Sequence, residues 1–443
     1  MVPNGEARYT GSILWELTVK TYLVGGAVRD QLLGLPVRDR DHVVVDATSA
    51  DMRALGFSPV GKDFPIFLHP VTREEHALVR GGGSARAALE ADLAARDLTI
   101  NAMAMDEDTG TLVDPLNGQQ DLRDKLLRPA PGFTEDPIRL LRAARFAARF
   151  QSLGFRLSEE LGDLMAAEVA RGALNHVSSD RVWLELSKAL TGPSPSVFLN
   201  TLQACGALAV LLPEVDALYG IPQNAQWHPE VDTGTHVEMV VDMAARLAPG
   251  QLDVAWAALT HDLGKALSDP AHLPKHHGHE KAGLIPLAAV HGRLPVPAAC
   301  MRLAKLVCEF HLEAHTTYES KPGTLHKLFG KLDAYRRPET LDNFLLACES
   351  DKRGRLGLTE GDYPQSAYLK GALQASMAVS ARPLVEQGLT GERLATALEQ
   401  ARLRALAAYK QEQIVLRQQA ANSVPTEEKV TAETSVRKRS FRP

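Results

Sequence analysis

The residues best suited to chemistry stand near the start of the chain, where two glycines precede a pair of carboxylates. Gly25 and Gly26 open the run Gly-Gly-Ala-Val-Arg-Asp, and Asp39 and Asp41 follow one residue apart, before the apolar run Val43–Val45. A Gly-Gly turn lets the backbone approach a triphosphate. Two carboxylates on one face of a strand repel each other, and magnesium relieves the repulsion while binding substrate phosphates. These residues predict metal-dependent nucleotidyl transfer.

A second group of candidates follows Pro137, where arginines recur at helical spacing. Arg139, Arg142, Arg145 and Arg149 stand three, three and four residues apart, which places them along one face of a helix. We expect no acidic partner on that face, so the stripe favours a bound phosphate or nucleotide. The alternative is an arginine face that forms salt bridges with acidic neighbours.

A histidine-rich stretch predicts a separate metal site. His261 and Asp262 are adjacent at the end of a helical run, and further histidines and an aspartate stand on either side. The predicted ligands are His236, His261, Asp262, His277 (with His279 as the alternative), His311 and Asp351. Mixed His/Asp ligation suits Mg²⁺, Mn²⁺, Ni²⁺ or Co²⁺, and the expected chemistry is attack of metal-activated water on a phosphoester.

These motifs, in their order along the chain, resemble those of the class II tRNA nucleotidyltransferases. The matching segments are Gly25–Asp41, Ala95–Ala102, Asp114–Gly118 and Glu135–Arg142. The CCA-adding enzymes of this class share a polymerase-β-like head with bacterial poly(A) polymerases. The resemblance implies template-independent addition of C, C and A to the 3′ end of tRNA from CTP and ATP, with release of pyrophosphate.

The resemblance also implies roles for individual residues. Asp39 and Asp41 would be catalytic and would hold magnesium. Asp136 and Arg139 would hydrogen-bond the Watson–Crick edge of CTP or ATP in place of a template. Glu75 is a candidate third carboxylate of the metal site, or an exposed charge on a strand. The other implied nucleotide contacts are Gly26, Arg29, Arg96, Arg142 and Arg145.

The histidine-rich region is similar to an HD-type phosphohydrolase domain, as carried by the long bacterial CCA enzymes. The similarity implies 2′,3′-cyclic phosphodiesterase, 2′-nucleotidase and phosphatase activities. Such activities suit the first site, because a tRNA end that carries a phosphate cannot offer the free 3′-hydroxyl that nucleotidyl transfer requires.

Two departures from the family pattern bear on how many nucleotides are added. Between Glu75 and Arg96 the family usually has a longer segment with a flexible loop, whereas this chain has the short run Gly81–Ser84 and then an Ala-rich helical stretch. In the family, a shortened loop is typical of CC-adding relatives. Ala95 also stands where the family commonly has an arginine. The alternatives are CC addition alone, a poly(A) polymerase, and an HD phosphohydrolase with a tRNA-binding head.

Several elements must position these residues, and 443 residues suffice for two to four domains. We predict an α+β protein in which a polymerase-β-like head, with a mixed sheet and helices, precedes an all-α body and an α-helical HD domain. The predicted parts are a lead-in over 1–20, the head over 21–137, a nucleotide-selecting and tRNA-binding neck over 138–225, the HD domain over 226–355, helices over 356–422 and a disordered tail over 423–443.

The composition excludes several other classes of protein. Hydrophobic residues make up 45% of the chain, and no apolar run reaches the ~20 residues of a membrane-spanning helix. The four cysteines are scattered, which argues against a disulfide framework. The net charge of -5 provides no overall attraction to RNA, so tRNA binding must rely on a local basic surface. We expect a cytoplasmic enzyme without a membrane partner, as a monomer or homodimer.

Overall fold

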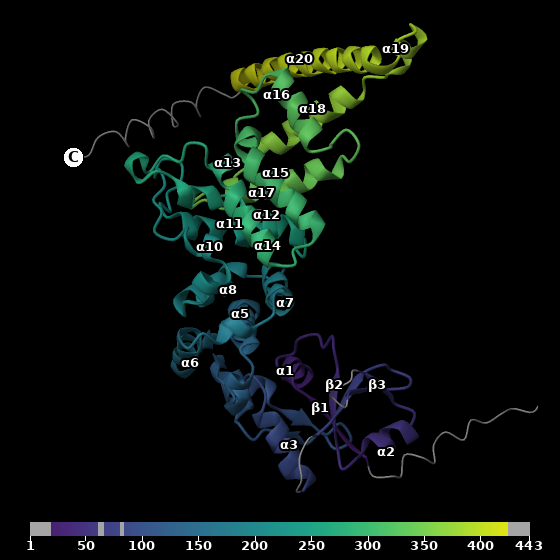
Figure 1. The fold of residues 1–443 in the computed structure, drawn as a ribbon, viewed down its shortest axis with the longest axis vertical. Coiled ribbons are helices and arrows are strands. Elements are labelled where there is room, and N and C mark those ends of the chain that lie inside the picture. The colour runs from purple at the N-terminus through teal and green to yellow at the C-terminus, as the bar shows by residue number, and fades with distance from the viewer. Residues whose placement is uncertain (1–18, 61–65, 80–83, 424–443) are drawn as a thin grey trace, which may run out of the picture. The chain divides into compact units, whose positions relative to one another are not determined.

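The computed structural model describes residues 19–60, 66–79 and 84–423. Nearly all of the predicted lead-in, most of the Gly81–Ser84 run and almost the whole predicted tail lie outside the described residues. The chain divides into two compact units, Met1–Asp216 with Arg293–Pro295, and Ala217–Gly292 with Val296–Pro443 (Figure 1).

The first unit begins with a mixed seven-stranded sheet. Its strands, in chain order, are β1 (Lys20–Val24), β2 (Asp41–Val45), β3 (Ser58–Val60), β4 (Ile66–Leu68), β5 (Glu75–Leu78), β6 (Ala104–Met105) and β7 (Leu112–Val113). The spatial order is β3-β4-β5-β2-β1-β6-β7. Only β2 and β5 run parallel to each other; the other neighbours are antiparallel. The predicted mixed sheet of the head is confirmed.

The central strand β2 is apolar because both of its faces are covered. Val43 and Val45 pack on one face in a cluster that includes Leu89 and Leu93 of α3 (Ala85–Ala94). On the other face, Val44 packs in a cluster that includes Met52 of α2 (Ser49–Ala54). Successive side chains of a strand alternate between faces. Burial on both sides therefore fixes the position of β2 and of the residues at its start.

Helices complete the first unit. After α1 (Gly26–Leu32) and the sheet come α4 (Gly118–Asp124), α5 (Ile138–Phe150), α6 (Glu159–Ala170), α7 (Ser179–Leu190), α8 (Pro195–Ala204), α9 (Ala207–Leu211) and α10 (Pro213–Asp216), with the short parallel pair β8 (Leu126–Leu127) and β9 (Arg156–Leu157). Helix α5 packs against α7 and α8. Its apolar side chains are buried and its arginines are half-buried, as expected for an amphipathic helix.

The described part of the second unit is helical. It contains α11 (Thr233–Leu247), α12 (Leu252–Thr260), α13 (His279–Ala282), α14 (Leu284–Arg293), α15 (Ala298–His315), α16 (Pro322–Lys331), α17 (Glu339–Arg353), α18 (Pro364–Met377), α19 (Arg382–Glu386) and α20 (Gly391–Ser423). Helix α12 is central and packs against α11, α15 and α17, while the long α20 packs against α16 and α18 (Figure 1). The expected helical body and helical HD domain are confirmed.

In the ranges that the structure describes, no helix combines the length and the apolar character needed to cross a membrane.

Candidate functional site

The turn between β1 and α1 places two glycines at the edge of the sheet where β1 ends and β2 begins. Gly25 has a φ of 66°, in the left-handed region where a side chain is strained. A Cβ at Gly25 would lie 2.6 Å from Nη1 of Arg96, so a side chain here would push the Arg96 guanidinium aside, while the backbone conformation itself favours glycine. The N–H of Gly25 donates to the carbonyl oxygen of Met103 at 3.1 Å. The Gly-Gly turn is therefore fixed beside an arginine.

The predicted catalytic carboxylates reach the same edge of the sheet. In the register of the strands, Val24 pairs with Asp41, and Asp41 pairs with Glu75 on β5. Paired residues on neighbouring strands point to the same face, so Glu75 lies beside Asp41. Asp39 precedes β2 instead of lying on it, contrary to expectation, because β1 has already turned away at Gly25 and offers no backbone for pairing.

The charges around Asp41 favour a cation. Partial burial raises the pKa of its carboxyl, Arg96 lowers the pKa, the neighbouring Asp39 raises it, and the net direction is upward. A divalent cation between the two carboxylates would reverse this direction by stabilising both charged forms. An oxygen-only donor set of this kind fits magnesium.

A cleft of about 1160 Å³ opens over this edge of the sheet, within the first unit. Ligand pockets are commonly about 300–1,000 Å³, so the cleft has room for a nucleotide together with the end of a second substrate. The residues predicted for the first site that line it are Gly26, Arg29, Asp39, Asp41, Arg96, Asp136, Arg139, Arg142 and Arg145. Helix α7 contributes three further charged side chains to the lining, from Arg181, Glu185 and Lys188.

The arginine stripe of α5 faces the cleft, but three of its four members form ion pairs with acidic side chains. The expectation of unpaired arginines is wrong, because the carboxylates come from α1, from the segment after α3 and from α7, which the spacing along α5 cannot reveal. The ion pairs are Arg142 with Asp97, Arg145 with Glu185 and Arg149 with Asp30.

Asp97 anchors one end of this network. Its buried carboxylate accepts hydrogen bonds from Nε of Arg142 at 2.8 Å, from Nδ2 of Asn101 at 2.9 Å and from the N–H of Leu98 at 2.8 Å. Burial raises the pKa of Asp97, but Arg142 and these hydrogen bonds outweigh burial and lower the pKa. Asp97 is therefore ionised and holds Arg142 in the cleft wall.

Arg29 is the most enclosed of the predicted nucleotide contacts. It is 3% exposed, and its guanidinium lies 5.0 Å from the ring centre of Phe146 and 5.1 Å from that of Phe150. Its Nε donates to Oδ1 of Asp30 at 2.8 Å, and Nη1 donates to Asn101. Arg29 therefore ties α1 to α5 as well as lining the cleft.

The two residues expected to select the base are also engaged. Asp136 accepts hydrogen bonds from Arg181 of α7, at 3.1 Å from Nη1, and from the N–H of Ile138 at 3.3 Å. Burial raises the pKa of Asp136, but these donors outweigh it and lower the pKa. Arg139 donates to the carbonyl oxygen of Arg96 at 3.1 Å. A bound base would have to replace these contacts.

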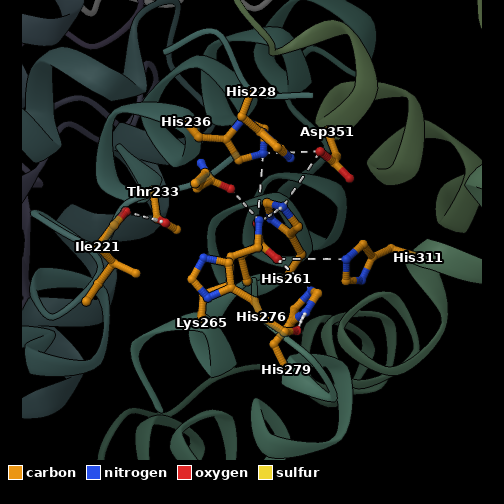
Figure 2. A network of polar contacts seen from close by, with 12 residues as sticks. Ile221, His228, Thr233, His236, His261, Lys265, His276, His279, His311 and Asp351 are labelled. Carbon is orange, nitrogen blue, oxygen red and sulfur yellow. Dashed lines mark hydrogen bonds and ion pairs between the residues drawn. The ribbon is translucent and has the colours of Figure 1, made fainter. Parts of the chain in front are cut away.

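In the second unit, five helices bring histidines and aspartates together around a buried centre. His236 lies in the first turn of α11, His261 and Asp262 directly follow α12, His279 begins α13, His311 is on α15 and Asp351 is on α17. All six side chains are buried, and Figure 2 shows the labelled ones pointing toward one another.

A first group of potential ligands forms around Asp351. Nε2 of His236 lies 3.1 Å from Oδ1 of Asp351, and Nε2 of His261 lies 3.9 Å from the same oxygen. Nε2 of His261 also lies 3.0 Å from Oδ2 of Asp262. His236, His261 and Asp351 are close enough together to hold one metal ion.

A second group forms around the other oxygen of Asp262. Its Oδ1 lies 3.3 Å from Nε2 of His279 and 3.8 Å from Nε2 of His311. These three residues form a further set with the geometry to hold an ion. Asp262 therefore extends one oxygen toward each group, and it would contribute a ligand atom to each of two divalent ions if both groups were occupied.

The histidines are held in the tautomer that a metal ligand requires. Nδ1 of His261, His279 and His311 lies 2.8, 2.7 and 2.9 Å from a backbone carbonyl oxygen. A carbonyl oxygen only accepts, so Nδ1 carries the proton and the Nε2 lone pair faces the centre. Among the described residues, Nε2 of His261 and His279 and Oδ1 of Asp262 are buried without a hydrogen-bond partner. The donor set fits divalent cations.

The pKa values of the histidines in this centre shift in different directions, because burial and the nearby carboxylates act in opposite senses. Burial lowers the pKa of His311 to about 3, which keeps the ring neutral. Burial raises the pKa of Asp262, but His261 and Lys265 outweigh it and hold the pKa well below its ordinary value. Burial lowers the pKa values of His261 and His279, but Asp262 outweighs burial and raises both. A bound cation would displace these protons, because a metal ion binds the neutral imidazole.

The structure brings His279 into the centre and leaves His277 outside it, so the predicted ligand His277 is replaced by His279. His277 is exposed, whereas His279 is buried. Close packing decides between them: a Cβ at Gly264 would lie 2.0 Å from the carbonyl oxygen of His279. The absence of a side chain at Gly264, two residues after Asp262, lets the start of α13 approach the centre.

Replacing His279 with alanine should weaken binding of one of two divalent ions by about 10²-fold or more, because it removes a ligand from the second group. His277→Ala is the matched control and should bind both ions as the wild type does. Calorimetric titration of the full chain with Mn²⁺ measures this. Equal weakening in both variants would contradict the assignment of His279.

Comparisons with known proteins agree with this arrangement of two sites. Residues 69–128 match the poly A polymerase head domain, residues 154–219 match a probable RNA and SrmB-binding site of polymerase A, and residues 233–347 match the HD domain. A multifunctional CCA protein of Xanthomonas euvesicatoria pv. vesicatoria is 52% identical over 404 residues, covering 88% of this chain and 98% of the relative. The chain belongs to the multifunctional CCA protein family.

Another member of the family and two solved structures are also similar to this chain, the structures in their fold. The multifunctional CCA protein of Pseudomonas aeruginosa is 52% identical over 408 residues, covering 89% of this chain and 99% of its own length. An apo CCA-adding enzyme has a similar fold, with a TM-score of 0.62, 22% identity and 92% of both chains covered. A Thermotoga maritima CCA-adding enzyme complexed with tRNA has a TM-score of 0.61, 20% identity, and 91% and 93% coverage.

In this member of the multifunctional CCA protein family, further side chains contact the proposed metal ligands, although they were not predicted from the sequence. Nε2 of His315 lies 2.6 Å from Oδ2 of Asp351, and Nζ of Lys265 lies 2.6 Å from Oδ2 of Asp262. Nδ1 of His236 lies 3.0 Å from Oε1 of Glu230. Lys265 stands three residues after Asp262, close enough to the His-Asp pair to be a usable signal, but nothing near Glu230 in the sequence marks it.

Proposed function

We propose that this chain adds C, C and A to the 3′ end of tRNA from CTP and ATP without a nucleic-acid template, and that its HD domain is a metal-dependent phosphohydrolase. The observation that best supports nucleotide addition is that one cleft is lined by Asp39, Asp41 and all the predicted nucleotide contacts. Membership of the multifunctional CCA protein family supports both activities. We assign them to a head over 21–137, a neck over 138–225 and an HD domain over 226–355, in a cytoplasmic protein.

In the head, Asp39 and Asp41 would hold magnesium, which supplies charge neutralisation at the attacking 3′-hydroxyl and the pyrophosphate leaving group. The left-handed turn at Gly25 and the adjacent Gly26 allow the triphosphate to come close to the backbone. Arg96, packed against that turn, and Arg29 are positioned to balance the phosphate charge. These residues orient the triphosphate for transfer of its nucleotidyl group to the tRNA.

Base selection is assigned to Asp136 and Arg139, on either side of the start of α5. An acceptor beside a forked donor can match the hydrogen-bonding edge of cytosine or adenine. Asp136 is bound to Arg181 before a base arrives, so selection involves an exchange of partners. Arg142 and Arg145 are proposed as further nucleotide contacts from the same helix.

In the HD domain, His236, His261, Asp262, His279, His311 and Asp351 would bind one or two divalent ions. A bound ion, Mg²⁺, Mn²⁺, Ni²⁺ or Co²⁺, activates water and polarises a phosphoester. The carbonyl-bound Nδ1 atoms keep the three imidazoles oriented. We propose 2′,3′-cyclic phosphodiesterase, 2′-nucleotidase and phosphatase activity on the ends of damaged tRNA, which restores the hydroxyl that the head needs.

The experiment is extension of a tRNA that ends at its discriminator base. Purified protein is given Mg²⁺ with CTP alone or with CTP and ATP, and the 3′ ends of the products are sequenced. Full function requires ends in CC with CTP alone and in CCA with both. A tRNA that ends in a 2′,3′-cyclic phosphate should be extended only after hydrolysis in the HD domain.

The alternatives give different products in the same assay. Ends that stop at CC in the presence of ATP would establish CC addition alone, and runs of A would indicate a poly(A) polymerase. Loss of the cyclic phosphate without any extension would leave only a phosphohydrolase with a tRNA-binding head.

A further inference from the structure

Three exposed apolar side chains lie in the two loops beside the metal centre of the second unit. Trp227 is 59% exposed and Val231 is 42% exposed in the loop before α11, and Leu356 is 56% exposed in the loop after α17. We call these three residues the apolar rim. An exposed tryptophan presents a large apolar surface to water. Neither proposed activity assigns a role to Trp227.

A buried carboxylate joins this rim to a proposed metal ligand. Oε1 of Glu230 lies 2.9 Å from Nδ1 of His228 and 3.0 Å from Nδ1 of His236, and its Oε2 accepts the N–H of Leu356 at 3.2 Å. The His228 ring, next in sequence to Trp227, also packs edge-on against the His236 ring with centroids 4.6 Å apart. Both loops are therefore fixed by the side chain that orients His236.

An arginine makes a second connection. Nη2 of Arg355 donates to Oδ1 of Asp351 at 3.1 Å, and Nη1 of the same guanidinium donates to the carbonyl oxygen of Trp227 at 3.5 Å. The Arg355 guanidinium therefore contacts both the backbone of Trp227 and a proposed metal ligand, Asp351. The loop that carries Trp227 thus borders the proposed metal centre.

The loop that carries Trp227 is held by several backbone hydrogen bonds. The N–H groups of Trp227 and His228 donate to the carbonyl oxygen of Asn224, at 3.0 and 2.9 Å. Val231 has a φ of 64°, a strained conformation for a β-branched residue, and its N–H donates to the carbonyl oxygen of His228 at 2.9 Å. A fixed backbone under an exposed indole loses little entropy when a flat ligand stacks on the ring.

We propose that Trp227 stacks on the nucleobase of the terminal nucleoside whose phosphate is hydrolysed in the HD domain. This rests on the proposed phosphohydrolase function and names its substrate class: nucleotide ends with a base, in preference to small phosphoesters. A single-stranded RNA 3′ end presents an unstacked base, and stacking on an aromatic ring binds every base because each has a π face. Trp227 is then a specificity-determining residue, and the metal ligands perform the chemistry.

The test compares a substrate that has a base with one that lacks it. Full-length wild type, Trp227→Ala and Trp227→Phe are loaded with Mn²⁺ and assayed on cytidine 2′,3′-cyclic phosphate and on glycerol 1,2-cyclic phosphate. In Trp227→Ala, KM for the cytidine substrate should rise about tenfold while kcat and the constants for the glycerol substrate stay unchanged. Trp227→Phe should retain most of the preference. Ile285→Ala, at a 71% exposed residue of α14, is the control.

A binding measurement separates this proposal from the phosphohydrolase function. With EDTA present, cytidine 3′-monophosphate should quench the tryptophan fluorescence of the wild type more than that of Trp227→Phe, which lacks one of the four tryptophans. If the wild type hydrolyses neither substrate, the proposed hydrolase function fails, and the quenching still decides the role of Trp227. Equal changes in KM for both substrates, or identical quenching in both proteins, would overturn the proposal.

Discussion

Nucleotide addition to tRNA should fall by about 10³-fold or more when Asp41 is replaced with asparagine. The substitution removes a charge from the carboxylate pair with Asp39, and the amide cannot neutralise magnesium as a carboxylate does. Asp41 begins β2 and lines the open cleft instead of packing in the core, so the fold should tolerate the change. Single-turnover extension with CTP measures the effect, and hydrolysis of a cyclic phosphate by the same preparation should be unchanged.

Asp46→Asn is the matched control, because it makes the same chemical change just past the other end of β2. Asp46 is exposed and has a φ of 57°, a conformation that asparagine adopts readily. This variant should extend tRNA at the wild-type rate. Wild-type extension by Asp41→Asn would show that transfer does not depend on this carboxylate pair.

The second large effect is expected at Asp262. Asp262→Asn should lower phosphoester hydrolysis by about 10³-fold or more and reduce the bound metal from two ions toward none, because this side chain contacts both ligand groups. It also removes the charge that pairs with buried Lys265. Elemental analysis of the dialysed protein gives the metal content. Extension of tRNA that has a free 3′-hydroxyl should continue at the wild-type rate.

Two controls distinguish loss of the centre from loss of the fold. Asp362→Asn changes an exposed aspartate of the same unit and should keep both its metal and its activity. The circular dichroism spectrum of Asp262→Asn should match the wild type. Two ions retained by Asp262→Asn would contradict the bridging role, and parallel loss of both activities would contradict two independent sites.

The parts of the head that could be predicted from sequence are those with short-range causes. The apolar run Val43–Val45 indicated a strand after the carboxylates, and the Gly-Gly turn with the nearby carboxylates identified the site within a short segment. The partners of the α5 arginines could not be predicted. Asp97 and Glu185 are far from α5 in sequence, and only the packing of α5 against α7 and against the segment after α3 brings them within reach.

The histidine centre shows the same division. The His-Asp pair and the distant histidines are recognisable residue by residue, and the predicted set agrees with the structure at five positions. His277 and His279 have the same side chain, so composition cannot separate them. The space that Gly264 leaves open for α13 separates them, and this is a property of tertiary packing. Glu230 and Trp227 were not predicted for the same reason.

The ion pairs of α5 have a further consequence for the first site. Arginines that line the cleft form ion pairs with Asp30, Asp97 and Glu185, and Asp136 forms an ion pair with Arg181. In the proposed nucleotide site, an incoming triphosphate would compete with the protein's own carboxylates for these cations, and its apparent affinity would scale with the fraction of molecules in which the arginines are free. These three carboxylates would thus compete with the phosphates of the substrate for the same arginines. An enzyme that must bind and release a nucleotide in each of several successive additions gains from such moderate affinity, because the arginines return to their own carboxylates after each release.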